Sequence, residues 1–238
     1  MFVGINMSVT SSENGRLTHA LGSAYLDAIR ETGAVPLLIP AGANDAELRA
    51  LTALADAFIF SGGPDYPPEF YGAEPHPETR TLHPVRAETD RRFARIVLRE
   101  THRPVLGICG GLQLAVIALG GRLIQHVARP EGHRAVGDTS ARHAIRVRPG
   151  SRLRALLGAD TVEVNSYHHQ AADPDAVPPE LRIAATAEDG TLEALEGVAE
   201  DRFLVLVQWH PECMDSADHR ARIIGGFAAA AREHVGRR

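Results

Sequence analysis

The first half of the chain alternates short apolar runs with longer amphipathic segments. Apolar residues recur at helical spacing from Leu17 to Ile29 and predict a helix that Gly33 ends. Other segments predicted to be helical are 44–54, 87–100 and 112–119, and predicted strands span 2–5, 35–39, 57–60 and 104–108. Strands that alternate with helices predict a parallel sheet covered on both faces, with ligands bound beyond the carboxyl ends of its strands.

The second half shows shorter and less regular apolar runs. A near-continuous apolar run over 203–207 predicts a buried strand, and Ser151 is a candidate N-cap for a helix ending at Leu157. Further strands are predicted over 122–125, 143–147, 161–164, 181–187 and 191–195, and a closing helix over 216–235. We expect some antiparallel pairing here, and a surface loop within 126–143. With no repeat and no linker, residues 1–238 are expected to form one α/β domain.

Composition narrows the class of protein. The 238 residues are 44% apolar and 23% charged, which is typical of globular domains. A net charge of −5 without a basic stripe argues against a nucleic-acid partner. No apolar run reaches the roughly 18 residues that a membrane span requires. Two cysteines in a chain of 238 residues do not form a disulfide framework, so a reducing, cytoplasmic location is expected.

The segment from Pro104 to Gln113 carries the first candidate for chemistry. An apolar strand reaches Cys109, flanked by glycines, and then becomes a helix, which is the pattern of a nucleophile elbow. The glycines leave room for the sharp bend, and the helix N-terminus beside the sulfur favours thiolate over thiol. A buried structural cysteine explains this segment about equally well when it is considered alone.

The segment from Val207 to Glu212 supplies a possible partner for the cysteine. His210 and Glu212 follow a buried strand and, two residues apart in extended backbone, can point the same way. A cysteine nucleophile needs a base, and the base needs an orienting carboxylate. The carboxyl ends of parallel strands would bring Cys109 and His210 together. A solvated turn explains the segment when it is considered alone.

Two more segments fit the same edge of the sheet. The turn Gly62-Gly63 and the amide of Gly110 can offer N–H donors to an oxyanion. The segment from Val164 to Gln170 contains adjacent histidines, but no spacing typical of a metal site, and we expect it to line the crevice without a metal. The remaining histidines, among them His126, His133 and His143, look scattered through polar loops.

These segments together resemble the class I glutamine amidotransferase-like superfamily, and within it the γ-glutamyl-γ-aminobutyrate hydrolase type. The resemblance runs nearly end to end, and its supporting pieces are the segments 60–65, 71–72, 119–121, 189–190 and 193–194. It implies a flavodoxin-like, doubly wound and mostly parallel sheet. It also implies a hydrolase of γ-glutamyl amides that acts through a glutamyl thioester, with neither a metal nor an organic cofactor.

The resemblance assigns roles to individual residues. Cys109 would be the nucleophile, His210 the proton shuttle and Glu212 the group that orients His210. Amides of Gly63 and Gly110 would form the oxyanion hole, within a turn that includes Gly62. The glutamyl end would be held by Gln113, Tyr167, His168 and His169.

One position departs from the family pattern. The hydrolase type usually carries Arg directly after the nucleophile, where this chain has Gly110. Without this guanidinium, the sequence does not predict which amine is the leaving group of the substrate. Two alternatives to the hydrolase therefore remain: a glutaminase subunit that delivers ammonia to a separate synthase, and a non-enzymatic binding module. The expected partner is a small γ-glutamyl substrate, a homodimer is compatible with the sequence, and a synthase partner belongs only to the first alternative.

Overall fold

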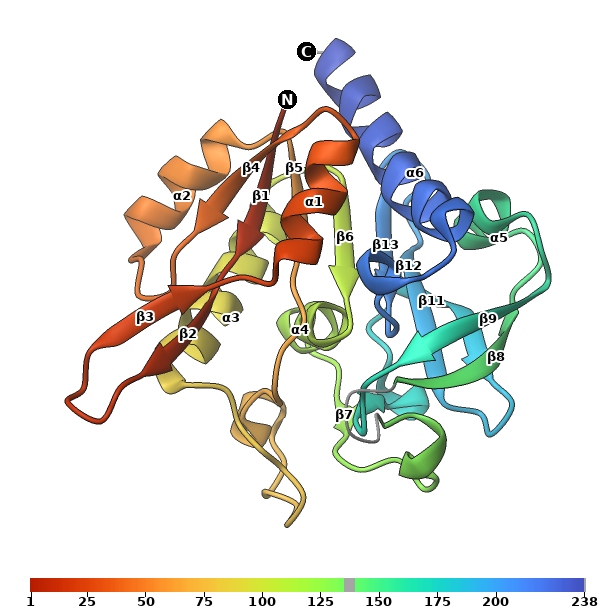
Figure 1. The fold of residues 1–238 in the computed structure, drawn as a ribbon, viewed down its shortest axis with the longest axis horizontal. Coiled ribbons are helices and arrows are strands. Elements are labelled where there is room, and N and C mark those ends of the chain that lie inside the picture. The colour runs from red at the N-terminus through yellow and green to blue at the C-terminus, as the bar shows by residue number, and fades with distance from the viewer. Residues whose placement is uncertain (135–139, 238) are drawn as a thin grey trace.

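The computed structural model describes residues 1–134 and 140–237 and places most strands in one large sheet (Figure 1). In the described chain this sheet has nine strands in the order β4-β1-β5-β6-β13-β12-β11-β8-β9. Pairing is parallel from β4 to β13 and antiparallel from β13 to β9. The predicted fold class, a mostly parallel sheet with antiparallel strands in the C-terminal half, is therefore confirmed.

The elements have the following bounds. The strands of the large sheet are β1 (Phe2–Asn6), β4 (Val35–Ile39), β5 (Ala57–Phe60), β6 (Val105–Ile108), β8 (Ala141–Val147), β9 (Thr161–Ser166), β11 (Leu181–Ala187), β12 (Leu192–Gly197) and β13 (Leu204–Val207). Two small ribbons pair β2 (Ser8–Ser11) with β3 (Leu17–Ala20) and β7 (Leu123–Ile124) with β10 (Ala171–Ala172). The helices are α1 (Ser23–Glu31), α2 (Asp45–Leu54), α3 (Pro84–Glu100), α4 (Gly110–Ala118), α5 (Arg152–Leu157) and α6 (Ala217–Gly236).

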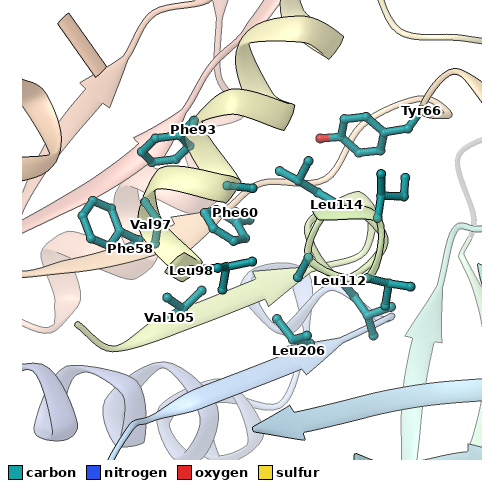
Figure 2. Packing of buried hydrophobic residues seen from close by; sticks show 14 of the residues in the cluster. Phe58, Phe60, Tyr66, Phe93, Val97, Leu98, Val105, Leu112, Leu114 and Leu206 are labelled. Carbon is teal, nitrogen blue, oxygen red and sulfur yellow. The ribbon is translucent and has the colours of Figure 1, made fainter. Parts of the chain in front are cut away.

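Helices cover both faces of the large sheet, as the alternation of elements predicts. On one face α2, α3 and α4 pack against side chains such as Phe58, Phe60 and Leu206. Figure 2 shows this core, in which Phe93 of α3 lies against Phe58 and Phe60 with both ring pairs edge to face. On the other face α1, α5 and α6 pack against a second apolar cluster. Burial of both faces explains why the central strands are apolar throughout.

Two helix starts follow the capping signals of the sequence. Asn44 forms a capping box with Glu47 at the start of α2. Ser151 caps α5 by accepting a hydrogen bond from the N–H of Arg154 at 2.9 Å. Among the described residues, no helix has the length and apolarity that crossing a membrane would require.

One predicted helix begins in the wrong place. The residues from Leu17 to Ala20 form strand β3 in an exposed hairpin, and the helix starts only at Ser23. The hairpin turns at Gly15, which has a φ of 78° and follows Asn14, a dipeptide that favours tight hairpin turns. The turn signal therefore outweighs the helical spacing of Leu17. Of the predicted surface loop within 126–143, residues 135–139 lie outside the described residues.

The sheet topology sets the place of the site. Strands β5, β6 and β13 are neighbours and run in parallel, so their carboxyl ends meet at one edge. Beyond these ends come Ser61, Cys109 and Gln208, respectively. Figure 1 shows α4 starting at the end of β6, in the centre of the molecule. Segments far apart in sequence are thus placed side by side, as expected from a parallel sheet.

Candidate active site

Cys109 lies at the sharp turn between β6 and α4. It is the N-cap of α4 with φ 52° and ψ −108°, and among the described residues it is the only non-glycine with a positive φ. Such a conformation costs of order 1–3 kcal/mol, and strain of this kind concentrates at functional sites. The N–H of Cys109 donates to the carbonyl oxygen of Val207 at 2.8 Å, which ties the turn to β13.

The glycines around Cys109 are required by close packing. A Cβ on Gly111 would lie 2.0 Å from the carbonyl oxygen of Phe60, and a Cβ on Gly107 would lie 2.6 Å from Cδ2 of Leu206. Both distances are far below a van der Waals contact. Gly111 therefore lets the start of α4 sit directly on β5, and Gly107 on β6 leaves room for Leu206 of β13 and for the carbonyl oxygen of Gly111.

His210 and Glu212 lie beside the thiol. Nδ1 of His210 is 2.7 Å from Oε1 of Glu212, whose side chain is buried. A Cβ built on Gly62 would lie 3.1 Å from Cε1 of His210 and 3.4 Å from Cβ of Cys109, so the ring and the cysteine both border this glycine. The side-chain amide of Gln208 also donates to Sγ of Cys109 at 3.6 Å.

The charges of the site favour an imidazolium. Burial alone would lower the pKa of His210, but the negative charges of Cys109 and Glu212 and their hydrogen bonds to the ring outweigh it. As a result the pKa of His210 is raised well above its ordinary value. The ring therefore holds its proton near neutral pH, which suits the acid that a leaving amine needs.

The glycine turn after β5 faces the start of α4. A Cβ on Gly110 would lie 3.2 Å from the amide nitrogen of Gly63, so these two backbone segments are close. As the first residue of α4, Gly110 has an N–H with no carbonyl partner inside the helix. The N–H of Gly62 donates to Oη of Tyr25 at 3.0 Å. Burial and the negative charge of Glu212 raise the pKa of Tyr25 well above its ordinary value, so the phenol is neutral.

A buried arginine fixes the same turn. The guanidinium of Arg86 donates to the carbonyl oxygen of Gly62 at 2.7 Å and to the Oγ of Ser61 at 3.1 Å, and it forms a buried ion pair with Asp90 at 3.1 Å. Tyr66 donates to the same carboxylate at 2.8 Å. Arg86 was not among the residues predicted for the site, although its spacing of four residues from Asp90 on a helix is a signal for an ion pair.

Asn165 at the end of β9 fixes the backbone of His210. Its Oδ1 accepts the N–H of His210 at 2.9 Å, and its Nδ2 donates to the carbonyl oxygen of His210 at 2.9 Å. Tyr167 follows and places its ring edge-on to the imidazole, with centroids 5.3 Å apart. The segment from Val164 to Gln170 thus reaches the site through Asn165 and Tyr167.

Three other predicted site residues contact protein groups away from Cys109 and His210. Nε2 of Gln113 lies 3.3 Å from the carbonyl oxygen of Gln170, which Nδ1 of His168 also approaches at 3.0 Å. The adjacent histidines point to different partners. Nε2 of His168 lies 3.4 Å from Glu193, and Nε2 of His169 lies 3.1 Å from Asp65. Both ring nitrogens of His168 therefore face protein atoms.

A second group of titratable residues includes His168 of the segment from Val164 to Gln170. We call it the histidine cluster; its members are His133, His143, His168 and Glu193. Burial alone would raise the pKa of Glu193, but the surrounding imidazoles hold it far below its ordinary value, so the carboxylate is ionised. His133 and His143, predicted to be scattered through polar loops, instead lie together around Glu193.

Comparison with known proteins places the chain in a class. The model of the Peptidase C26 family matches residues 2–212, so the chain belongs to this family, which is class I glutamine amidotransferase-like. With relatives that are γ-glutamyl-γ-aminobutyrate hydrolases, the family identifies a hydrolase that acts on amide bonds.

Individual relatives carry two kinds of name. The chain is 32% identical to "Gamma-glutamyl-gamma-aminobutyrate hydrolase PuuD" of Escherichia coli over 93% of this chain and 90% of that protein. It is 38% identical to "Putative glutamine amidotransferase Rv2859c" of Mycobacterium tuberculosis over 81% of this chain, and it spans 62% of that longer protein. A solved structure from Thermoplasma acidophilum, a "putative gmp synthase subunit a protein", shares the fold with a TM-score of 0.65 at 16% identity, covering 100% of this chain and 98% of that one.

Proposed function

We propose that the chain hydrolyses γ-glutamyl amides through a glutamyl thioester on Cys109. The observation that carries this proposal is the strained backbone of Cys109, which holds the thiol at a helix N-terminus beside the His210–Glu212 pair. A buried structural cysteine would need neither the strain nor the ionised partners. A free thiol is required, and the cytoplasm is the proposed compartment.

The proposed reaction has two halves. The thiolate of Cys109 attacks the γ-carbonyl carbon, and the oxyanion receives hydrogen bonds from the amides of Gly63 and Gly110. The imidazolium of His210 gives its proton to the leaving nitrogen as the C–N bond breaks. The neutral ring then takes a proton from water, the hydroxide attacks the thioester, and the C–S bond breaks. Glutamate leaves, and the thiolate and the imidazolium are regenerated.

The proposal extends to substrate contacts. We propose that Tyr167 and Gln113 line the subsite for the glutamyl α-amino and α-carboxylate groups. His168 and His169, whose rings are engaged with Glu193 and Asp65, support that subsite by holding the segment around Tyr167.

Release of glutamate from a panel of γ-glutamylated amines, with glutamine included, tests the proposal. The Cys109→Ala variant should lose all turnover, and Cys213→Ala is the matched control because Cys213 is the exposed free cysteine. Turnover that survives Cys109→Ala, or a wild-type protein inert on every member of the panel, would refute the proposal.

The second candidate is a glutaminase subunit that supplies ammonia to a synthase. Gly110 favours it, because a residue without a side chain offers no group for an acidic leaving amine. This candidate predicts that glutamine is the preferred substrate and that a synthase purified from the native host raises its turnover. Preference for a γ-glutamylated amine over glutamine decides for the hydrolase.

A further inference from the structure

Three imidazoles from separate segments meet one carboxylate in the histidine cluster. Nδ1 of His133, Nε2 of His143 and Nε2 of His168 lie 3.3 Å, 3.2 Å and 3.4 Å from the same Oε1 atom of Glu193. Glu193 lies on β12 and His143 on β8, while His133 follows a 3₁₀ turn and His168 follows β9. The cluster therefore joins parts of the chain that are 10 to 60 residues apart.

The facing atoms of the cluster are buried and lack hydrogen bonds. Side-chain exposure is 3% for His133, 15% for His143, 2% for His168 and 0% for Glu193. The three facing nitrogens and both carboxylate oxygens of Glu193 have no hydrogen-bond partner among the described residues. The three nitrogens face Oε1 at ion-pair distance without hydrogen-bond geometry, and buried polar atoms are normally paired, so a ligand between them would satisfy the group.

The other nitrogen of each ring faces an oxygen atom. Nδ1 of His143 faces the carbonyl oxygen of Gly132 at 3.2 Å, and Nδ1 of His168 faces that of Gln170 at 3.0 Å. Nε2 of His133 faces the Asp189 carboxylate at 2.9 Å. Because oxygens of this kind accept, each of these nitrogens can carry a proton and donate it there. A cation bound between the rings and Glu193 would select this tautomer, with the facing nitrogens as ligands.

We propose that the histidine cluster binds one divalent transition-metal ion, with zinc(II) as the ion that fits best. Two imidazole nitrogens, from His133 and His143, and a carboxylate oxygen of Glu193 form a donor set that zinc takes in proteins. Zinc–ligand bonds of roughly 2.0–2.1 Å in a tetrahedron place neighbouring ligand atoms about 3.3 Å apart. The contacts of 3.3 Å and 3.2 Å from these nitrogens to Oε1 match this spacing, while His168 lies outside the group of candidate ligands. The ligand atoms of His133, His143 and Glu193 also all lie within 4.8 Å of one another.

The surroundings have the features of a metal site. Metal-bound histidines usually donate their other N–H to a carbonyl or a carboxylate, and the other nitrogen of His133 and of His143 faces such an oxygen here. The carbonyl oxygen of His133 accepts the N–H of His168 at 2.9 Å and the hydroxyl of Ser166 at 2.7 Å, which fixes two of the rings together. An open hollow of about 410 Å³ borders His133, His143 and Asp189 and gives an ion a way in.

Three protein ligands, His133, His143 and Glu193, would bind β8, β12 and the turn before His133 to one another. The carbonyl oxygen of His133 accepts the N–H of His168, which follows Tyr167, so metal binding would help to order the wall of the candidate active site that Tyr167 forms against His210. The metal proposal stands independently of the proposed hydrolase reaction.

Metal analysis of the untagged full-length protein tests the proposal. The protein is stripped with a chelator, incubated with zinc, separated by gel filtration and analysed by mass spectrometry for metals. We expect close to one zinc per chain, a lower melting temperature after stripping, and visible absorption of tetrahedral cobalt(II) that saturates at one equivalent. Less than a tenth of an equivalent of zinc and no cobalt spectrum would overturn the proposal and leave protonated imidazoles as the explanation.

Variants locate the ion. His143→Ala and His133→Ala should each reduce zinc binding at least tenfold, while His126→Ala, in a different group of histidines, should keep the full equivalent. Circular dichroism shows whether each variant is folded. If both variants unfold, the cobalt titration of the wild-type protein decides alone. Full zinc retention in a folded His143→Ala protein would overturn the assignment.

Discussion

Glu212 controls how strongly His210 holds its proton, and Glu212→Gln tests this control. Gln has nearly the same shape as Glu, so the change removes the negative charge 2.7 Å from Nδ1 of His210 and little else. A hydrogen bond to a charged group contributes about 1.5–3 kcal/mol, and one pKa unit corresponds to about 1.36 kcal/mol. The pKa of His210 should therefore fall by roughly 1–2 units in the variant.

The assay is the pH dependence of kcat/KM on a γ-glutamyl amide. Activity needs the imidazolium, so the rate falls as pH rises through the pKa of His210. In Glu212→Gln this alkaline limb should move down by roughly 1–2 pH units, and kcat/KM at the optimum should fall about ten- to hundredfold. Glu233→Gln, at an exposed position on α6, is the control and should change neither quantity.

Stability gives an independent check with a defined sign. Because the folded pKa of His210 is raised, its contribution to stability is complete below the ordinary histidine pKa of about 6.5 and is lost as pH rises through the folded value. Glu212→Gln should therefore cost most stability in urea unfolding at acidic to neutral pH, and the difference should shrink at high pH. An alkaline limb that stays in place while the rate falls would refute the reasoning.

Three further predictions concern the framework of the site. Gly111→Ala should lower stability by at least about 2 kcal/mol, because its Cβ would meet the carbonyl oxygen of Phe60 at 2.0 Å, whereas Gly225→Ala, with nothing within 4 Å, should raise it by about 0.5–1 kcal/mol; equal thermal shifts for the two would contradict this. Arg86→Gln should cost about 3–5 kcal/mol in urea unfolding because it leaves Asp90 as an unpaired buried charge, and Arg30→Gln, in an exposed pair, should cost less than about 1 kcal/mol; similar costs would show that the buried pair is unimportant. Asn165→Ala should lower kcat about tenfold or more with little change in KM, since it frees the backbone of His210, and steady-state kinetics with an unchanged kcat would contradict that role.

Local signals in the sequence predicted the order of elements well. The apolar strands and the capping residues Asn44 and Ser151 act within a few residues, so their effects can be read without the fold. The error at Leu17 had a local cause as well: the Asn14–Gly15 turn makes a hairpin of a segment whose apolar spacing also suits a helix.

Contacts between residues far apart along the chain could not be predicted from the sequence. Asn165 contacts His210 only because β9 ends beside the loop after β13, and no spacing along the chain records that. The histidine cluster likewise depends on the antiparallel pairing of β8, β9, β11 and β12. Single histidines in separate strands carry no pattern, whereas the glycines around Cys109 sit within one segment and could be interpreted.

The central claim is that Cys109 carries the glutamyl group during turnover. Rapid acid quenching of the enzyme with a γ-glutamyl amide, followed by peptide mass mapping, tests this directly. We expect a single glutamyl adduct on the peptide that contains Cys109, and no adduct in Cys109→Ala. Full turnover without an adduct in any variant, or an adduct on Cys213 instead, would contradict it.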